Sequence, residues 1–190
     1  MRMKNILKNR LALSTVVTTL IILVVSVLLA GVVTYYAINV TSTRVTQESL
    51  TVEMLHCWCP QTATAFGGNS PTEAAFLIIN TGGRDVDINK ITIRGQTAPW
   101  AQVYFGVGTS TTDLAYLAGP AATAIAGATV GTATLGTTTG DLTLKSGNTM
   151  IIYIVGPDSI TINDIGLTVG ITVFTSQAMY YEEANVQAYV

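Results

Sequence analysis

The feature that most constrains this chain is the stretch from Leu11 to Thr43, which contains no charged side chain. Within it, Leu13–Ile38 is almost continuously apolar and is interrupted mainly by small hydroxyl residues. At 1.5 Å per residue, a helix over these residues would measure about 39 Å, whereas the hydrocarbon core of a bilayer is about 30 Å thick. We therefore predict one helix that is long enough to span a membrane with some tilt.

The charges on the two sides of this stretch differ in sign. The first ten residues carry only basic charges, whereas Arg44 on the far side is followed by Glu48 and Glu53; the basic residues are Arg2, Lys4, Lys8 and Arg10. Because basic segments stay on the cytoplasmic side, the N-terminus is expected in the cytoplasm and the remaining domain outside the cell.

Charged residues make up only 11% of the chain, and the formal net charge is −2. Soluble domains usually carry about a quarter of their residues as charged side chains. The composition excludes an intrinsically disordered chain and a basic nucleic-acid binder, and it argues against an ordinary cytosolic enzyme.

The N-terminal arrangement is similar to a known family. A short basic leader, the sequence Arg10-Leu11-Ala12-Leu13-Ser14 and a long apolar helix resemble the class III signal of archaeal type IV pilins and archaellins. The resemblance implies that a membrane prepilin peptidase cleaves between Ala12 and Leu13, which removes leader residues 1–12 and retains the helix. Here Leu11 separates Arg10 from Ala12, whereas the family usually places a basic residue directly before the small residue.

The retained helix, expected over residues 13–48, would need an apolar environment both before and after cleavage. A helix that is apolar all round can be buried in lipid or among copies of itself, where small residues allow close approach. Five small residues provide narrow points, although any membrane span can contain such residues: Ser14, Ser26, Ala30, Gly31 and Ala37. Polar but helix-compatible sequence continues over Asn39–Glu48, which favours a filament subunit over a tethered receptor.

Residues 49–190 are predicted to form a domain built from β-strands, which we call the head. The fold class is therefore α+β: a long N-terminal hydrophobic helix followed by an antiparallel, immunoglobulin-like β-sandwich. A one-residue slip in the alternation at Asn89-Lys90 predicts a β-bulge. The expected strands are Ser49–Trp58, Glu73–Asn80, Val86–Ile93, Trp100–Phe105, Asp141–Lys145, Met150–Val155, Ser159–Ile165, Leu167–Phe174 and Ala178–Val190.

Two segments of the head extend the family resemblance more loosely. The sequences IINTGGRDVDINKITIRG and GLTVGITVFTSQAMYYEEANVQA are similar to strands of archaellin and archaeal pilin heads. Between them, residues 117–140 consist almost wholly of Ala, Gly and Thr. We interpret this segment as a flexible surface insertion or a weak hairpin around Thr129–Leu135. The sharper hypothesis is a Thr-rich surface that carries O-linked sugars, which would compensate for the missing charge.

Residues that carry chemistry are concentrated in His56-Cys57-Trp58-Cys59-Pro60. In a strand, His56 and Trp58 share one face while Cys57 and Cys59 share the other. Structural zinc needs four ligands, and no second cluster exists, so metal is the weakest hypothesis. The first hypothesis for Cys57 and Cys59 is that they are buried free thiols, and the second is that they form an intersubunit or local disulfide.

The remaining polar motifs do not indicate an active site. Asp85 and Asp87, like the Glu182-Glu183 pair, are interpreted as solvated strand-edge charge rather than as calcium ligands or catalytic acids. The sequence lacks a GxSxG elbow, a P-loop, a dinucleotide fingerprint and an HExxH motif, so we predict no enzymatic activity and no cofactor. The sequon at Asn39 lies where an assembled filament would bury it, so it is expected to be unoccupied.

These expectations favour a pilin-like subunit of an adhesive filament on the cell surface, whose precursor sits in the membrane. Its partners would be further copies of itself and, by the resemblance, prepilin peptidase, an assembly ATPase and a membrane platform; glycans are a further candidate. The alternatives are an archaellin that serves motility and a single-pass anchored β-sandwich that acts as a binding or stator module.

Overall fold

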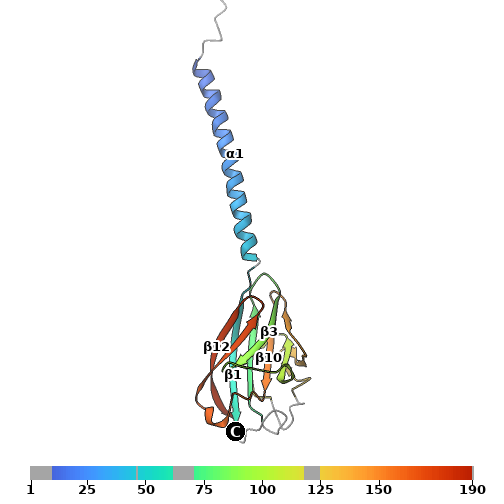
Figure 1. The fold of residues 1–190 in the computed structure, drawn as a ribbon. Coiled ribbons are helices and arrows are strands. Elements are labelled where there is room, and N and C mark those ends of the chain that lie inside the picture. Colours follow the sequence, from blue (N-terminus) through green and yellow to red (C-terminus); the bar gives the residue numbers. More distant parts are fainter. Residues whose placement is uncertain (1–9, 46, 62–70, 118–124, 190) are drawn as a thin grey trace, which may run out of the picture. The chain divides into compact units, whose positions relative to one another are not determined.

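The computed structural model describes residues 10–45, 47–61, 71–117 and 125–189. The chain divides into two compact units, Met1–Val45 and Thr46–Val190, which are described separately here (Figure 1). Residues 1–9 of the expected leader and residues 118–124 of the expected Ala/Gly/Thr-rich loop lie outside the described residues.

The first unit contains helix α1, which begins at Arg10 and ends at Val45. Its segment Ser14–Thr43 has a mean hydropathy of 2.9 over its most apolar window and is long and apolar enough to cross a membrane. The expected N-terminal apolar helix is therefore confirmed.

The second unit, the head, is a β-structure in which ten strands form one curled sheet and two form a separate hairpin. In the sheet, neighbouring strands follow the order β4-β3-β11-β12-β1-β2-β10-β5-β8, and β9 pairs with β3. The strands are β1 Leu50–Pro60, β2 Glu73–Asn80, β3 Val86–Ile93, β4 Gln96–Thr97, β5 Val103–Val107, β6 Thr129–Val130, β7 Ala133–Thr134, β8 Gly136–Thr137, β9 Leu142–Leu144, β10 Thr149–Val155, β11 Thr168–Thr175 and β12 Met179–Tyr189.

Strand β12 joins the two halves of this sheet. Its first part pairs antiparallel with β11, from Phe174 opposite Met179 to Thr168 opposite Asn185. Its last part runs parallel to β1, with Cys57 opposite Val186. The sheet is therefore mostly antiparallel but not wholly so, and the expectation of a purely antiparallel arrangement is corrected at this pair.

Two expected strands also need correction. Residues Ser159–Ile165 do not form a strand; they contain the short 3₁₀ helix η4, Ile162–Asp164. The Asp164 carboxylate accepts hydrogen bonds from the Thr161 backbone and hydroxyl, and this capping box stabilises a turn. The segment expected from Trp100 starts instead as the 3₁₀ helix η2, Trp100–Gln102, and becomes extended only in β5.

Two β-bulges set which side chains face inward. In β3, Lys90 pairs with Phe174 and Ile88 with Thr175, so the slip predicted at Asn89-Lys90 is confirmed. In β1, a second bulge lies between Glu53 and His56, where Met54 adopts a positive φ of 51°. The one extra residue reverses the alternation of side chains in β1. Even-numbered side chains therefore face the inside of the curled sheet before this bulge, and odd-numbered ones face it after the bulge.

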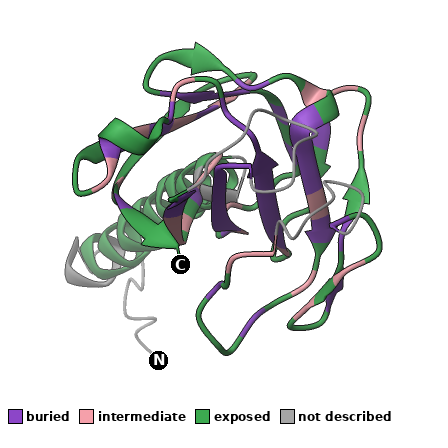
Figure 2. Cartoon of the chain, turned by 90° about the horizontal axis from the view of Figure 1, so that it is seen from below, coloured by how far each residue is buried: buried purple, intermediate pink, exposed green. Residues whose placement is uncertain are grey.

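The central strands β2 and β10 are buried on both faces, as the purple ribbons in Figure 2 show. Phe76, Ile152 and their neighbours pack inside the curl of the sheet against β3 and β11. Leu77, Tyr153 and their neighbours face the other way, against Ile125, Ala133 and Leu135.

This second apolar cluster overturns one reading of the Ala/Gly/Thr-rich segment. Its described part carries the β6–β7 hairpin, which confirms the hairpin expected near Thr129–Leu135, and it covers one face of the sheet. The described part is therefore not a loose insertion on the surface, because Ile125 and Leu135 are fully buried and Leu117 and Val130 pack partly buried against the same cluster.

Candidate functional site

The largest exposed apolar surface in the described residues belongs to α1. Side chains at consecutive positions of the helix are exposed, so the surface runs around the whole circumference rather than along one stripe. Leu20, Leu23 and Leu28 are each at least 60% exposed. Surfaces of this size mark contact with a membrane or with other proteins.

The hydroxyl groups of α1 do not interrupt this surface. The Ser26 hydroxyl donates to the Ile22 carbonyl at 2.5 Å, and the Thr34 hydroxyl donates to the Ala30 carbonyl at 2.8 Å. Thr18 and Thr43 bond in the same way to the carbonyls four residues earlier. These donors are satisfied within the helix, so α1 can enter a medium without water at little cost.

Gly31 lies in the middle of α1 and has no role inside the chain. A Cβ atom added there would meet nothing within 4 Å, and the backbone needs no left-handed conformation. A glycine in a helix interior costs about 1 kcal/mol relative to alanine. In membrane helix pairs, glycine occurs where two helix backbones approach closely.

The other N-terminal candidates also lie on α1. Ala12 and Leu13, the residues of the expected scissile bond, belong to the first turns of the helix. Asn39 of the sequon lies near the other end, is exposed, and accepts a hydrogen bond from the Thr43 hydroxyl through its carbonyl.

Cys57 and Cys59 point into the core within the curl of the sheet, and both are buried free thiols in the structure. Burial raises the pKa of the Cys57 thiol to about 12, and burial likewise raises the pKa of Cys59. The thiolate is the reactive form of cysteine, and a raised pKa disfavours it for both side chains.

His56 and Trp58 lie on the opposite face of β1, as strand alternation predicts. Their rings stack with centroids 5.2 Å apart and an angle of 12° between planes. The His56 Nε2 atom lies 2.7 Å from an Asp113 carboxylate oxygen, and this hydrogen bond lowers the pKa of Asp113. His56 therefore points away from both thiols, and the described residues hold no group of three His, Cys, Asp or Glu that could bind a metal ion.

The acidic residues singled out in the sequence have structural partners. Asp87 accepts a hydrogen bond from the Thr143 hydroxyl, and Asp85 accepts one from the Ser146 backbone, so both secure the pairing of β3 with the β9 segment. The Tyr181 hydroxyl donates to Glu183, whereas Glu182 is exposed. Sequence reasoning missed Asp113 and Asp164. Asp113 pairs with His56 and Asp164 with Arg94, and both of these partners lie far away along the chain, whereas the local Thr161–Asp164 capping box was hidden in a segment expected to be a strand.

No protein-family model and no curated protein matches the sequence. Among solved structures, the chain is similar to a family 123 glycoside hydrolase from Clostridium perfringens that hydrolyses glycolipid glycans, at 9% identity and a TM-score of 0.33. The match covers 75% of this chain and 27% of the hydrolase. A likeness at this TM-score defines neither the fold nor the activity of the chain.

Proposed function

We propose that this protein is the structural subunit of a cell-surface filament of the archaeal type IV pilus kind, which polymerises through α1 and serves adhesion. The observation that carries the proposal is the apolar surface of α1, which is exposed around its whole circumference over Ser14–Thr43. Such a helix is stable first in lipid and then in a bundle of identical helices. In a filament, each helix contacts its neighbours through a heterologous interface that does not close into a ring.

The precursor would sit in the membrane with its span placed by two tyrosines. Tyr35 and Tyr36 are 73% and 70% exposed on α1. Tyr35 lies 22 positions after Leu13 in the helix, a rise of about 33 Å, which is close to the thickness of the hydrocarbon core. Tyrosines are enriched at the membrane–water boundary, so this pair suits the outer boundary when Leu13 lies at the inner one.

The proposal also covers processing and partners. Cleavage between Ala12 and Leu13 by prepilin peptidase would remove the basic leader and leave α1 at the N-terminus of the subunit. Polymerisation would need an assembly ATPase and a membrane platform, since the sequence has no nucleotide-binding motif. The curled sheet would then serve as an immunoglobulin-like sandwich head on the outside of the filament, with β12 crossing between its two layers.

The first test is N-terminal sequencing of the protein from sheared surface filaments. The expected first residue is Leu13, and the expected location is the filament fraction. A protein that stays at full length in membranes and never enters sheared filaments contradicts the proposal. That result would favour the single-pass anchored module instead.

A second test uses Gly31, whose missing side chain leaves room for a neighbouring helix. Gly31→Leu is expected to reduce filament yield severalfold, because the added side chain blocks close helix approach, while precursor in the membrane stays at the wild-type level. The matched control is Val32→Leu, which enlarges a side chain that is already exposed. Equal filament yields for both variants would show that Gly31 makes no helix contact.

The β6–β7 hairpin of the head offers exposed threonine hydroxyls as candidate attachment sites for sugars. Thr129 and Thr134 are exposed on the β6–β7 hairpin, and charges are sparse there. We expect O-linked sugars on these hydroxyls. Mass spectrometry of hairpin peptides from native filaments should detect the added hexose masses, and fully unmodified peptides would contradict this part.

A further inference from the structure

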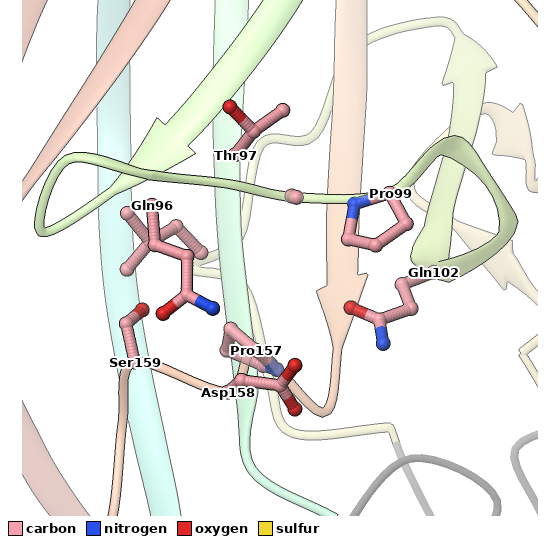
Figure 3. Close-up of a pocket in the computed structure, with 9 residues that line it drawn as sticks. Gln96, Thr97, Pro99, Gln102, Pro157, Asp158 and Ser159 are labelled. Carbon is pink, nitrogen blue, oxygen red and sulfur yellow. The ribbon is translucent and has the colours of Figure 1, made fainter.

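A small pocket lies in the head between two segments that are distant in the sequence. One wall is formed by the turn after β3 and by the approach to η2, and the other by the segment that follows β10 (Figure 3). Its volume is about 120 Å³, well above what a single water molecule needs. Ile93, Ala98, Pro99 and Pro157 supply apolar wall, and the polar lining residues are Gln96, Thr97, Gln102, Asp158 and Ser159.

The unusual group in this pocket is the carboxamide of Gln102. The residue is only 9% exposed, and its Oε1 atom is buried without a hydrogen-bond donor. Among the described residues, no other side-chain nitrogen or oxygen is buried without a partner. An unsatisfied buried acceptor costs about 1–3 kcal/mol, so a ligand that brings a donor to Gln102 would recover this loss.

Both walls are held in place by hydrogen bonds. The Ala98 backbone donates to the Ile91 carbonyl at 2.9 Å, and the Gln102 backbone donates to the Pro99 carbonyl at 2.9 Å. Across the pocket, Arg94 donates to the Ser159 carbonyl at 3.3 Å and to the Asp164 carboxylate at 2.5 Å. The pocket is therefore formed before any ligand arrives.

The charge around the pocket selects for a cation. Figure 3 shows the carboxamide of Gln102 and the carboxylate of Asp158 directed toward each other at the same side of the pocket. Asp158 is exposed, and the guanidinium of Arg94 is already paired with Asp164. These two acceptors lie beside the apolar surfaces of Pro99 and Pro157, and together they fit a ligand with several donors and a positive charge on a short aliphatic stem.

We propose that this pocket binds a primary alkylammonium group, either the side chain of a lysine on a partner protein or the end of a free aliphatic diamine. The aliphatic stem would pack on Pro99 and Pro157, and the ammonium would donate to Asp158 and to Oε1 of Gln102. A rotation of the carboxamide about its last bond, which is a soft torsion, brings the oxygen toward the ligand. This binding site does not depend on filament formation.

The test uses the full chain in nonionic detergent micelles and saturation-transfer NMR of small probes. N-acetyl-lysine methylamide and putrescine are the amine probes, and N-acetyl-norleucine methylamide has the same stem without the charge. Methyl glucoside tests for a ligand that donates through hydroxyl groups. We expect saturable binding of the amines and none of the other two probes.

Two substitutions assign the site. Asp158→Asn and Gln102→Leu are each expected to weaken amine binding about tenfold or more, because each removes an acceptor for a charged donor. Asp141→Asn, which removes an exposed charge that does not line the pocket, is the control and should bind like wild type. Asp158 is exposed, so its variant tests the site even when Gln102→Leu fails to fold.

The probes also separate the two sources of the ammonium group. Binding of both amines indicates a lysine side chain, whereas binding of putrescine alone indicates a free diamine. The proposal is overturned when the norleucine probe binds as tightly as the lysine probe, when only the glucoside binds, when no probe binds, or when Asp158→Asn keeps wild-type affinity.

Discussion

Asp164 is a single carboxylate that holds two segments of the head together. It accepts hydrogen bonds from the Thr161 backbone at 2.7 Å and hydroxyl at 2.8 Å, and from Arg94 at 2.5 Å. The Thr161 hydroxyl is the main cause that lowers the pKa of Asp164, and Arg94 lowers this pKa further. The ionised form is therefore the one that stabilises the fold.

This arrangement predicts how stability depends on pH. A carboxyl whose pKa is lowered by folding contributes stability above its unfolded pKa, near 4, and loses it as the pH falls through the lower folded value. We expect Asp164→Asn to reduce the free energy of unfolding by about 2 kcal/mol at pH 7. The difference from wild type should shrink below about pH 4.

The measurement is urea unfolding followed by the fluorescence of Trp58 and Trp100, which both lie in the head. Asp141→Asn is the matched control, because it removes a solvent-exposed carboxylate. A difference between wild type and Asp164→Asn that stays constant from pH 7 to pH 3 would contradict the role of the ionised carboxylate.

At the same scale, the sequence predicted some details and concealed others. The slip at Asn89-Lys90 was visible because polar residues interrupt the alternation of β3. The bulge at Met54 was missed, because Met54 and Leu55 are both apolar and either of them suits the apolar face of the strand. The buried, unpartnered Oε1 atom of Gln102 results from contacts between distant segments, which a local sequence pattern does not predict.

At the scale of elements, the Ala/Gly/Thr-rich segment covers a face of the sheet with only a few apolar side chains. Ile125, Ala133 and Leu135 are fully buried there, and the Tyr153 hydroxyl donates to the Ala115 carbonyl at 3.0 Å just before the segment begins. The Leu117 backbone donates to the buried carboxylate of Glu73 at 2.9 Å. Composition alone suggested a loop, because a few large side chains are diluted among many small ones.

Removing one of these side chains should therefore be costly. Leu135→Ala is expected to lower the free energy of unfolding of the head by about 3 kcal/mol, because it leaves a cavity on the sheet. Val107→Ala is the control, since Val107 is 52% exposed and its substitution should cost well under 1 kcal/mol. Equal unfolding curves for both variants would show that the hairpin does not pack on the sheet.

At the scale of the whole molecule, the two units obey different physical rules. The helix α1 was predicted well because its pattern needs no distant partner, and a long apolar run has few alternative structures in water or lipid. The head was predicted as β-structure, but its strand order and its parallel β1–β12 pair depend on contacts that local alternation does not encode.

Because the units have separate sets of internal contacts, a change in one should not weaken the other. We expect Leu23→Arg in α1 to abolish filament formation, since a charge in a helix bundle or a bilayer centre costs several kcal/mol. The urea unfolding of the head in detergent should stay at the wild-type midpoint. A shift of that midpoint would show that α1 contributes to the stability of the head.

The parallel pairing of β1 with β12 also sets the order in which the head can fold, because it joins the first strand of the head to the last. At Cys57 and Trp58, β1 has one neighbour, β2, that follows soon after it and another, β12, that comes more than a hundred residues later. This edge of β1 therefore stays unpaired until β12 has been synthesised. Pairing of segments so distant in the sequence is slow, and an unpaired strand edge is open to association with other chains in the meantime.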